Sequence, residues 1–381
     1  MLTSLLLFSA AVGLPQAPSA APAAPGRDTV VSVVFSAVGG SVTRAGLYTA
    51  GASGGTGRVV AASGRVADTT TVRVAGGPAP AAAIAPPPPP TTGGLGIPFG
   101  PFGAWQGVGL RANADRFSLG LGPDKVEDIT RRIAAARAGR KKLMLVMTGG
   151  HHRNYKTAGA FDFRKWQATM EGFNTTAIRQ AVAEGVADGT IIGTSVMDEP
   201  HNTSSENSWG PPGTVTKALV DEMCGYVKTI FPTLPAGVVH DYRVFEPETN
   251  YAVCDFVVSQ YREAKGSVTA FRDGGVAFAR RSGVAIAFSL NVLDGGTRMS
   301  GCPVPATGGR GTMGGNCRMT PGQVREYALA LGPAGCALTL WRFDPDYMAN
   351  PDNQRVFTEI QTHLATLPAR GCRRSTTAAT P

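Results

Sequence analysis

The stretch that most restricts the fold runs from Ile191 to His201 and reads Ile-Ile-Gly-Thr-Ser-Val-Met-Asp-Glu-Pro-His. Its first seven residues are mostly apolar or β-branched, which is typical of a strand buried on both faces of a parallel sheet. Pro200 cannot donate a hydrogen bond to a neighbouring strand and forces its predecessor into an extended conformation. We therefore expect Asp198 and Glu199 at the C-terminal tip of a buried strand, where α/β folds place their chemistry.

Residues 94–370 alternate between apolar runs and helical periodicity. Besides the stretch above, strands are expected at 97–105, 143–147, 238–244, 256–261, 284–292 and 337–343. Helices are expected at 123–136, 163–173, 177–187, 214–230 and, capped by Thr320, 321–332. We expect an eighth strand between residues 148 and 191. This α/β alternation predicts a (β/α)8 TIM barrel, rather than a doubly wound sheet with a Gly-x-Gly-x-x-Gly motif after its first strand.

Residues 1–25 have the pattern of a signal peptide, with an apolar core at 5–14 and small residues at 17–24. No apolar run approaches the roughly 20 residues that span a bilayer. We therefore expect an exported protein, secreted or located in the periplasm or at the cell surface, without membrane insertion.

Residues 28–76 are rich in Val, Thr, Ser and Gly and predict a small all-β module. The segments 39–43 (Gly-Gly-Ser-Val-Thr), 46–51 and 67–74 resemble the second half of bacterial immunoglobulin-like surface domains, which implies a spacer or adhesive unit. A Pro-rich linker is expected at 77–93, with five consecutive prolines at 86–90. A disordered tail is expected at 371–381.

The formal net charge of +9 raises the question of nucleic-acid binding. Lys and Arg are scattered, however, and form dense runs only at 137–142 and 370–374. We therefore expect no nucleic-acid binding. We also expect a monomer that needs no cofactor.

Polar and aromatic residues follow nearly every expected strand, and in a barrel they would ring one rim. Carboxylates beside flat aromatic surfaces suit a sugar, because its C–H faces stack on rings and its hydroxyls need polar partners. The expected catalytic carboxylates are Glu199, Asp198, Asp294 and Glu263. The expected substrate-binding residues are Trp105, His152, His201, His240, Arg243, Tyr261, Asn291 and Trp341.

An acidic residue followed by Glu-Pro at the fourth strand, a Tyr at the sixth and a Trp at the eighth resemble the clan A glycoside hydrolases. The resemblance implies hydrolysis of a poly- or oligosaccharide, with Glu199 as the proton donor. That family carries a glutamate nucleophile on its seventh strand, whereas this strand ends Phe-Ser-Leu-Asn-Val-Leu-Asp294. Asp294 or Glu263 would have to take that role.

Two alternatives stay open. His151, His152, His201 and His240, with Asp198 or Asp294, could bind zinc in a metal-dependent hydrolase. The barrel could instead hold a carbohydrate without cleaving it.

Six cysteines in an exported chain favour disulfides. We expect a bond between Cys302 and Cys317, which bracket a Gly-rich loop. The pairing of Cys224, Cys254, Cys336 and Cys372 stays undetermined.

Overall fold

The computed structural model describes residues 34–38, 40–42, 48–50, 55–63, 66–74, 96–148, 152–203, 208–297, 302 and 317–375. The chain divides into two compact units, residues 1–86 and 87–381. The expected signal peptide and Pro-rich linker lie outside the described residues. Within the described residues, no helix is both long and apolar enough to cross a membrane.

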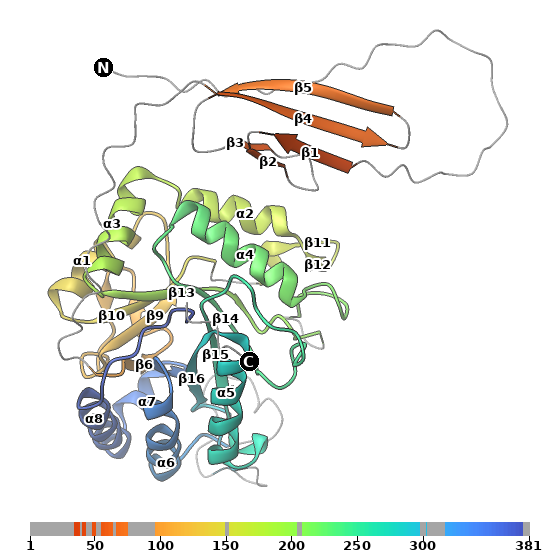
Figure 1. Cartoon of the computed structure of the whole chain (residues 1–381). Helices are drawn as coiled ribbons and strands as arrows, with labels where there is room; N and C mark the ends of the chain where they lie inside the picture. The colour runs from red at the N-terminus through yellow and green to blue at the C-terminus, as the bar shows by residue number, and fades with distance from the viewer. Residues whose placement is uncertain are drawn as a thin grey trace. The chain divides into compact units, whose positions relative to one another are not determined.

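The first unit consists of antiparallel strands, drawn in red and orange in Figure 1. β1 (Val34–Val38), β4 (Gly55–Ser63) and β5 (Val66–Val74) form one sheet, and β2 (Gly40–Val42) pairs with β3 (Tyr48–Ala50). The predicted all-β module is therefore present, but an immunoglobulin-like arrangement is not confirmed.

The second unit is built on eight parallel strands in the order β6-β17-β16-β15-β14-β13-β10-β9 (Figure 1). The edges meet where Phe102 bridges to Leu121 and the Gly103 N–H donates to the Leu121 carbonyl at 2.8 Å. A Cβ at Gly100 would lie 1.9 Å from the Leu119 carbonyl oxygen, so glycine allows this approach. The predicted (β/α)8 barrel is confirmed. Its strands are β6 (Phe99–Pro101), β9 (Leu119–Pro123), β10 (Lys142–Val146), β13 (Ile191–Asp198), β14 (Ala236–Val239), β15 (Phe256–Tyr261), β16 (Ala285–Asn291) and β17 (Leu338–Trp341).

Helices and short hairpins connect the strands. Residues 102–118 and 240–255, all described, connect their strands without a helix. The helices are α1 (Ile129–Ala138), α2 (Phe163–Gly172), α3 (Thr176–Ala187), α4 (Lys217–Ile230), α5 (Val268–Ser282), α6 (Pro321–Leu331), α7 (Pro345–Ala349) and α8 (Pro351–Ala365). The hairpins are β7 (Trp105–Gln106) with β8 (Gly109–Leu110), and β11 (Lys156–Thr157) with β12 (Ala160–Phe161).

The eighth strand was expected in the wrong place. It is β9, and the described residues between 148 and 191 add only the β11–β12 hairpin, a 3-10 turn, α2 and α3. β9 was not recognised in the sequence because two of its five residues are glycines. Gly120 is required because a Cβ there would lie 1.7 Å from Nε1 of Trp105. Pro123 ends this strand instead of starting a helix, and α1 begins at Ile129.

Side chains of the strands alternate between the barrel interior and the helix layer. The interior cluster contains Leu119, Leu121, Met144, Phe256, Val258, Ala287, Cys336, Ala337 and Cys372. Residues between these along the strands, such as Val257 and Phe288, pack against the helices instead. This alternation decides which strand-end residues face the mouth of the barrel.

Three disulfides pair all six cysteines: Cys224–Cys254, Cys302–Cys317 and Cys336–Cys372. The predicted Cys302–Cys317 bond is confirmed. The tail expected to be disordered from residue 371 is ordered through residue 375, and Cys372 is only 2% exposed.

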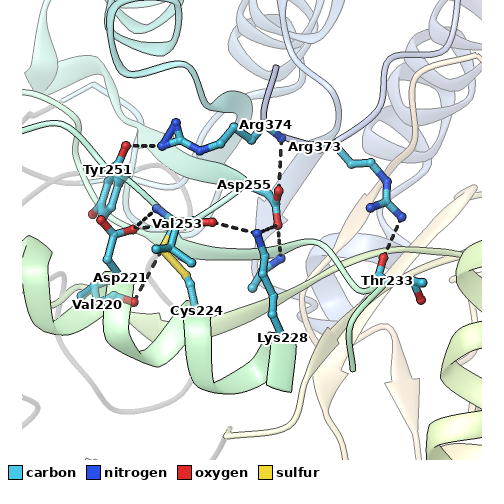
Figure 2. A network of polar contacts seen from close by, with 12 residues as sticks. Val220, Asp221, Cys224, Lys228, Thr233, Tyr251, Val253, Asp255, Arg373 and Arg374 are labelled. Atoms are coloured by element: carbon cyan, nitrogen blue, oxygen red, sulfur yellow. Dashed lines mark hydrogen bonds and ion pairs between the residues drawn. A yellow bond between two sulfur atoms is a disulfide. The ribbon is translucent and has the colours of Figure 1, made fainter. Parts of the chain in front are cut away.

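We call residues 370–375 the C-terminal strap, because they bind several segments that precede barrel strands. The Arg374 N–H donates to Asp255 at 3.3 Å, and its guanidinium donates to the Ser282 carbonyl at 3.0 Å and to the Tyr251 carbonyl. Arg373 donates to the Thr233 carbonyl at 2.7 Å (Figure 2). The strap therefore lies at the N-terminal end of the barrel, opposite the C-terminal ends of the strands.

Candidate functional site

The end of β13 departs from regular strand geometry. Its pairing with β14 shifts register between Ser195 and Asp198, which is a β-bulge. Asp198 consequently lies opposite Val239, whose side chain packs against the interior cluster. Paired residues on neighbouring strands share a face, so the bulge turns Asp198 toward the barrel interior.

Glu199 adopts a left-handed backbone conformation with φ of 44°, which is uncommon for a residue with a side chain. Its N–H still donates to the Val239 carbonyl at 2.7 Å, and its carbonyl accepts from the Asn202 N–H at 2.9 Å. The strand alternation thus ends between Asp198 and Glu199.

Asp198 is the carboxyl that the barrel keeps close to neutral. Burial raises its pKa from the ordinary 3.8 to about 7, and the negative charge of Glu199 adds to the rise. A carboxyl with this pKa holds a proton during part of its time at pH 7, as a general acid must. The sequence led us to assign the acid role to Glu199 alone.

Next to this pair, at the end of β14, Asp241 binds two cations. Its carboxylate accepts from Nε and Nη2 of Arg243 at 3.1 and 2.9 Å and from Nζ of Lys265 at 2.8 Å. Burial alone would raise the pKa of Asp241, but these two partners outweigh it and hold the pKa well below the ordinary range. Asp241 is therefore a fixed anion that anchors the two cations, and Lys265 was not identified from the sequence.

His201 interacts electrostatically with both groups of charges. Burial lowers its pKa, although the negative charges of Glu199 and Asp241 act in the opposite direction. Its Nδ1 is buried and has no hydrogen-bond partner within the described residues.

An aromatic surface lies at the β6 and β17 side of the mouth. The rings of Phe102 and Trp341 are 4.8 Å apart, tilted by 36°. Trp341 lies opposite Asn291 of β16, and the Trp341–Arg342 peptide is cis. Phe102 was not identified from the sequence, although it directly follows a strand. A partly exposed ring pair of this kind can stack on the C–H face of a sugar.

Asp294 follows β16, where its N–H donates to Oδ1 of Asn291 at 3.1 Å. Burial raises its pKa, against the positive charge of Arg262. Its Oδ1 is buried and has no partner among the described residues. Asp294 therefore stays in our candidate set.

The structure places Trp105, His240 and Tyr261 away from the mouth, and we correct these assignments. Trp105 is 5% exposed and packs on the backbone of β9. Nδ1 and Nε2 of His240 bond to the Asp241 carbonyl and the Tyr251 hydroxyl at 3.0 and 2.9 Å. The Tyr261 hydroxyl donates to the Gly266 carbonyl at 2.6 Å. Strand alternation turns His240 and Tyr261 into the helix layer.

Glu263 also has a structural environment. Its Oε2 accepts from Gln323 Nε2 at 2.6 Å and from the Thr297 hydroxyl at 2.8 Å. Gln323 is in the first turn of α6, so this carboxylate is held toward that helix. We therefore remove Glu263 from the candidate catalytic residues.

Two other expected binding residues have defined surroundings. The imidazole of His152 stacks on the indole of Trp209, with centroids 3.9 Å apart. Arg243 is held by Asp241 as described above. Among the described residues, no three His, Cys, Asp or Glu side chains are grouped as a metal site would require. His151 lies outside the described residues.

No protein-family model matches the chain. No curated protein sequence matches it. Similar solved structures include a GH10 xylanase with a bacterial Ig-like domain from termite gut, at 13% identity over 89% of this chain and 96% of that chain, TM-score 0.39. An endo-1,4-β-mannanase from Eisenia fetida has 9% identity over 71% and 92%, TM-score 0.46, and a cellulase–inhibitor complex has 9% over 81% and 97%, TM-score 0.46. Because these scores reach only 0.46, we argue the function from this chain's own side chains.

Proposed function

We propose that the chain is an exported glycoside hydrolase that cleaves a poly- or oligosaccharide at the C-terminal mouth of the barrel. The observation that carries the proposal is Asp198, a half-buried residue directly beside Glu199, whose carboxyl has its pKa raised to about 7 by desolvation. An acid that works near neutral pH needs a pKa in this range. The three disulfides support export, because such bonds persist in oxidising compartments.

In this proposal the Asp198–Glu199 pair supplies the proton to the departing glycosidic oxygen. Asp198 retains a proton near neutral pH and donates it, while the negative charge of the neighbouring Glu199 helps to keep the pKa of Asp198 raised. The carboxylate that acts on the anomeric carbon or activates water is Asp294. The ring pair of Phe102 and Trp341 stacks on the sugar.

The arrangement of the remaining polar groups supports binding of hydroxyl groups. Asn291 lies opposite Trp341 in the barrel. Arg243 and Lys265, fixed by Asp241, provide further N–H donors. A sugar ring presents several hydroxyls that need partners of this kind.

The test is release of reducing sugars from a panel of glycans by the purified chain. Asp198→Asn and Glu199→Gln should each lower turnover by about 10²- to 10⁴-fold, the usual contribution of general acid catalysis. Substrates with a good leaving group should lose much less, because they need little protonation. Glu359→Gln, which removes an exposed carboxylate of α8 paired with Arg325, is the matched control. Equal activity of all three variants would refute the assignment.

A carbohydrate-binding barrel without hydrolysis is the second candidate. It is favoured by the absence of a glutamate from β16, which is fully described, and by the engagement of Glu263 with α6. Binding of a glycan by the wild type without any release of reducing ends would support this candidate over hydrolysis.

A further inference from the structure

Two backbone carbonyls in the bulged part of β13 accept hydrogen bonds from tryptophan side chains. Nε1 of Trp166 donates to the Val196 carbonyl at 3.0 Å, and Nε1 of Trp209 donates to the Asp198 carbonyl at 2.6 Å. A bulge interrupts the regular ladder, and buried carbonyls then need partners from elsewhere. The second of these bonds holds the residue that carries the candidate acid.

Trp209 is itself held in place by other parts of the chain. It is 4% exposed, stacks on His152 with an interplanar angle of 17°, and meets the Phe161 ring edge-on at 5.5 Å. The backbone N–H of Trp209 donates to the Asn202 carbonyl at 3.0 Å, and the backbone carbonyl of Trp209 accepts from the Phe161 N–H at 2.8 Å. The position of the indole therefore does not depend on its bond to Asp198.

Trp209 also reaches Glu199. The carbonyl of Asn202 accepts from the backbone N–H of Trp209, and the N–H of Asn202 donates to the Glu199 carbonyl at 2.9 Å. Trp209 thus bonds through its indole to the main chain of Asp198. Its backbone N–H adds a separate link, through Asn202, to the main chain of Glu199. These contacts span the point where the strand alternation ends.

We infer that Trp209 is a positioning residue, which holds Asp198, and with it the neighbouring Glu199, in the mouth through its indole N–H. The catalytic part of this inference rests on the proposed function. Trp209 touches no reacting atom in this account and acts only through the backbone of the two carboxylates.

Trp209→Phe tests the N–H, because it keeps an aromatic ring against His152 but has no donor for the Asp198 carbonyl. A buried acceptor without a partner is costly, so the end of β13 should relax toward water. Asp198 would then lose part of its burial. A displacement of about 1 Å in a catalytic group can cost about 10²-fold in rate. We therefore expect kcat to fall by about 10- to 100-fold, with KM changed by less than about threefold.

Trp166→Phe is the matched control. It removes the same kind of donor, an indole N–H that bonds to a backbone carbonyl of β13. The side chain of Val196, however, packs in the hydrophobic core and not in the mouth. This variant should be destabilised like Trp209→Phe while keeping wild-type kcat. An equal loss of kcat in both variants would show a general effect of weakening β13 and would overturn the specific role of Trp209.

A second readout needs no catalysis. Asp198→Asn is introduced into the wild type, Trp209→Phe and Trp166→Phe, and unfolding midpoints in urea are measured at pH 5 and pH 8. The charged Asp198 is disfavoured by burial, so Asp198→Asn should raise the midpoint more at pH 8 than at pH 5. That extra gain should fall to less than half in Trp209→Phe and persist in Trp166→Phe. The titratable residues Glu199, His201 and Asp241 are not mutated in any of these variants.

The two readouts separate the two proposals. If the wild type cleaves no glycan, the proposed function fails, and the urea measurements still decide whether Trp209 holds Asp198. If the pH-dependent gain is the same in Trp209→Phe as in the wild type, the inference is wrong whatever the activity.

Discussion

His240 and Tyr251 share a buried hydrogen bond of 2.9 Å between the imidazole Nε2 and the phenol hydroxyl. The Nδ1 atom of His240 lies 3.0 Å from the Asp241 carbonyl, so Nδ1 carries the proton and Nε2 accepts. Both nitrogens are satisfied in the neutral imidazole. Burial accordingly lowers the pKa of His240 to about 3.

This arrangement predicts sensitivity to acid. Between pH 6.5 and about pH 3 the unfolded His240 binds a proton that the folded one excludes, so stability falls as the pH falls through this window. Each pH unit is worth at most about 1.4 kcal/mol for one group. His240→Gln should reduce the loss of unfolding free energy between pH 7 and pH 4.5, measured in urea. His363→Asn, at an exposed position of α8, should leave that loss unchanged.

The titration of Asp198 should change stability with pH in the opposite direction. Its folded pKa of about 7 exceeds the ordinary 3.8, so the folded state binds the extra proton and Asp198 lowers stability increasingly as the pH rises from about 4 to 7. Asp198→Asn should therefore melt at a higher temperature than the wild type at pH 8, with the difference shrinking toward pH 4. Equal melting temperatures at pH 8 would contradict the burial of this carboxyl.

The buried pair of Asp124 and Arg132 should stabilise the β9–α1 connection. Nη1 of Arg132 lies 2.8 Å from Asp124 Oδ1, and both side chains are at most 4% exposed. Burial raises the pKa of Asp124 to about 6 despite the charge of Arg132. Arg132→Met leaves this carboxylate unpaired, which typically costs about 3–5 kcal/mol.

The cost of Arg132→Met should grow with pH, because protonation of Asp124 relieves the unpaired charge in acid. Chemical denaturation at pH 5 and pH 8 measures this. Arg131→Met on the exposed side of α1 breaks a surface pair with Asp128 and should cost less than about 1 kcal/mol at either pH. A loss for Arg132→Met as small as that of Arg131→Met would rule out this role.

The C-terminal strap should contribute stability without affecting the mouth. Cys336–Cys372 closes a loop across 36 residues, which is worth about 3–4 kcal/mol in the chain-entropy model. Replacing both cysteines by serine should lower the melting temperature and leave kcat at 25 °C unchanged, because the strap lies at the opposite end of the barrel. A selective loss of kcat in a fully folded double variant would contradict this separation.

Local pattern predicted those features that depend on burial and spacing along the chain. The apolar run before Asp198, the capped helix at Thr320 and the Cys302–Cys317 bond all follow from residues close together in sequence. The alternation of strands and helices predicted the barrel for the same reason. β9 was missed because its glycines serve the distant Trp105, not the strand itself.

The site depends on relationships that no local pattern contains. The bulge in β13 decides that Asp198 faces inward, and the alternation of short strands turns His240 and Tyr261 into the helix layer. Lys265 meets Asp241 only after β14 and β15 have paired, and the indole of Trp209 is placed beside Asp198 by its packing on His152 and Phe161. Register, bulges and long-range hydrogen bonds are set by the packing of the whole barrel, because a shift of one residue reverses every side chain of a strand.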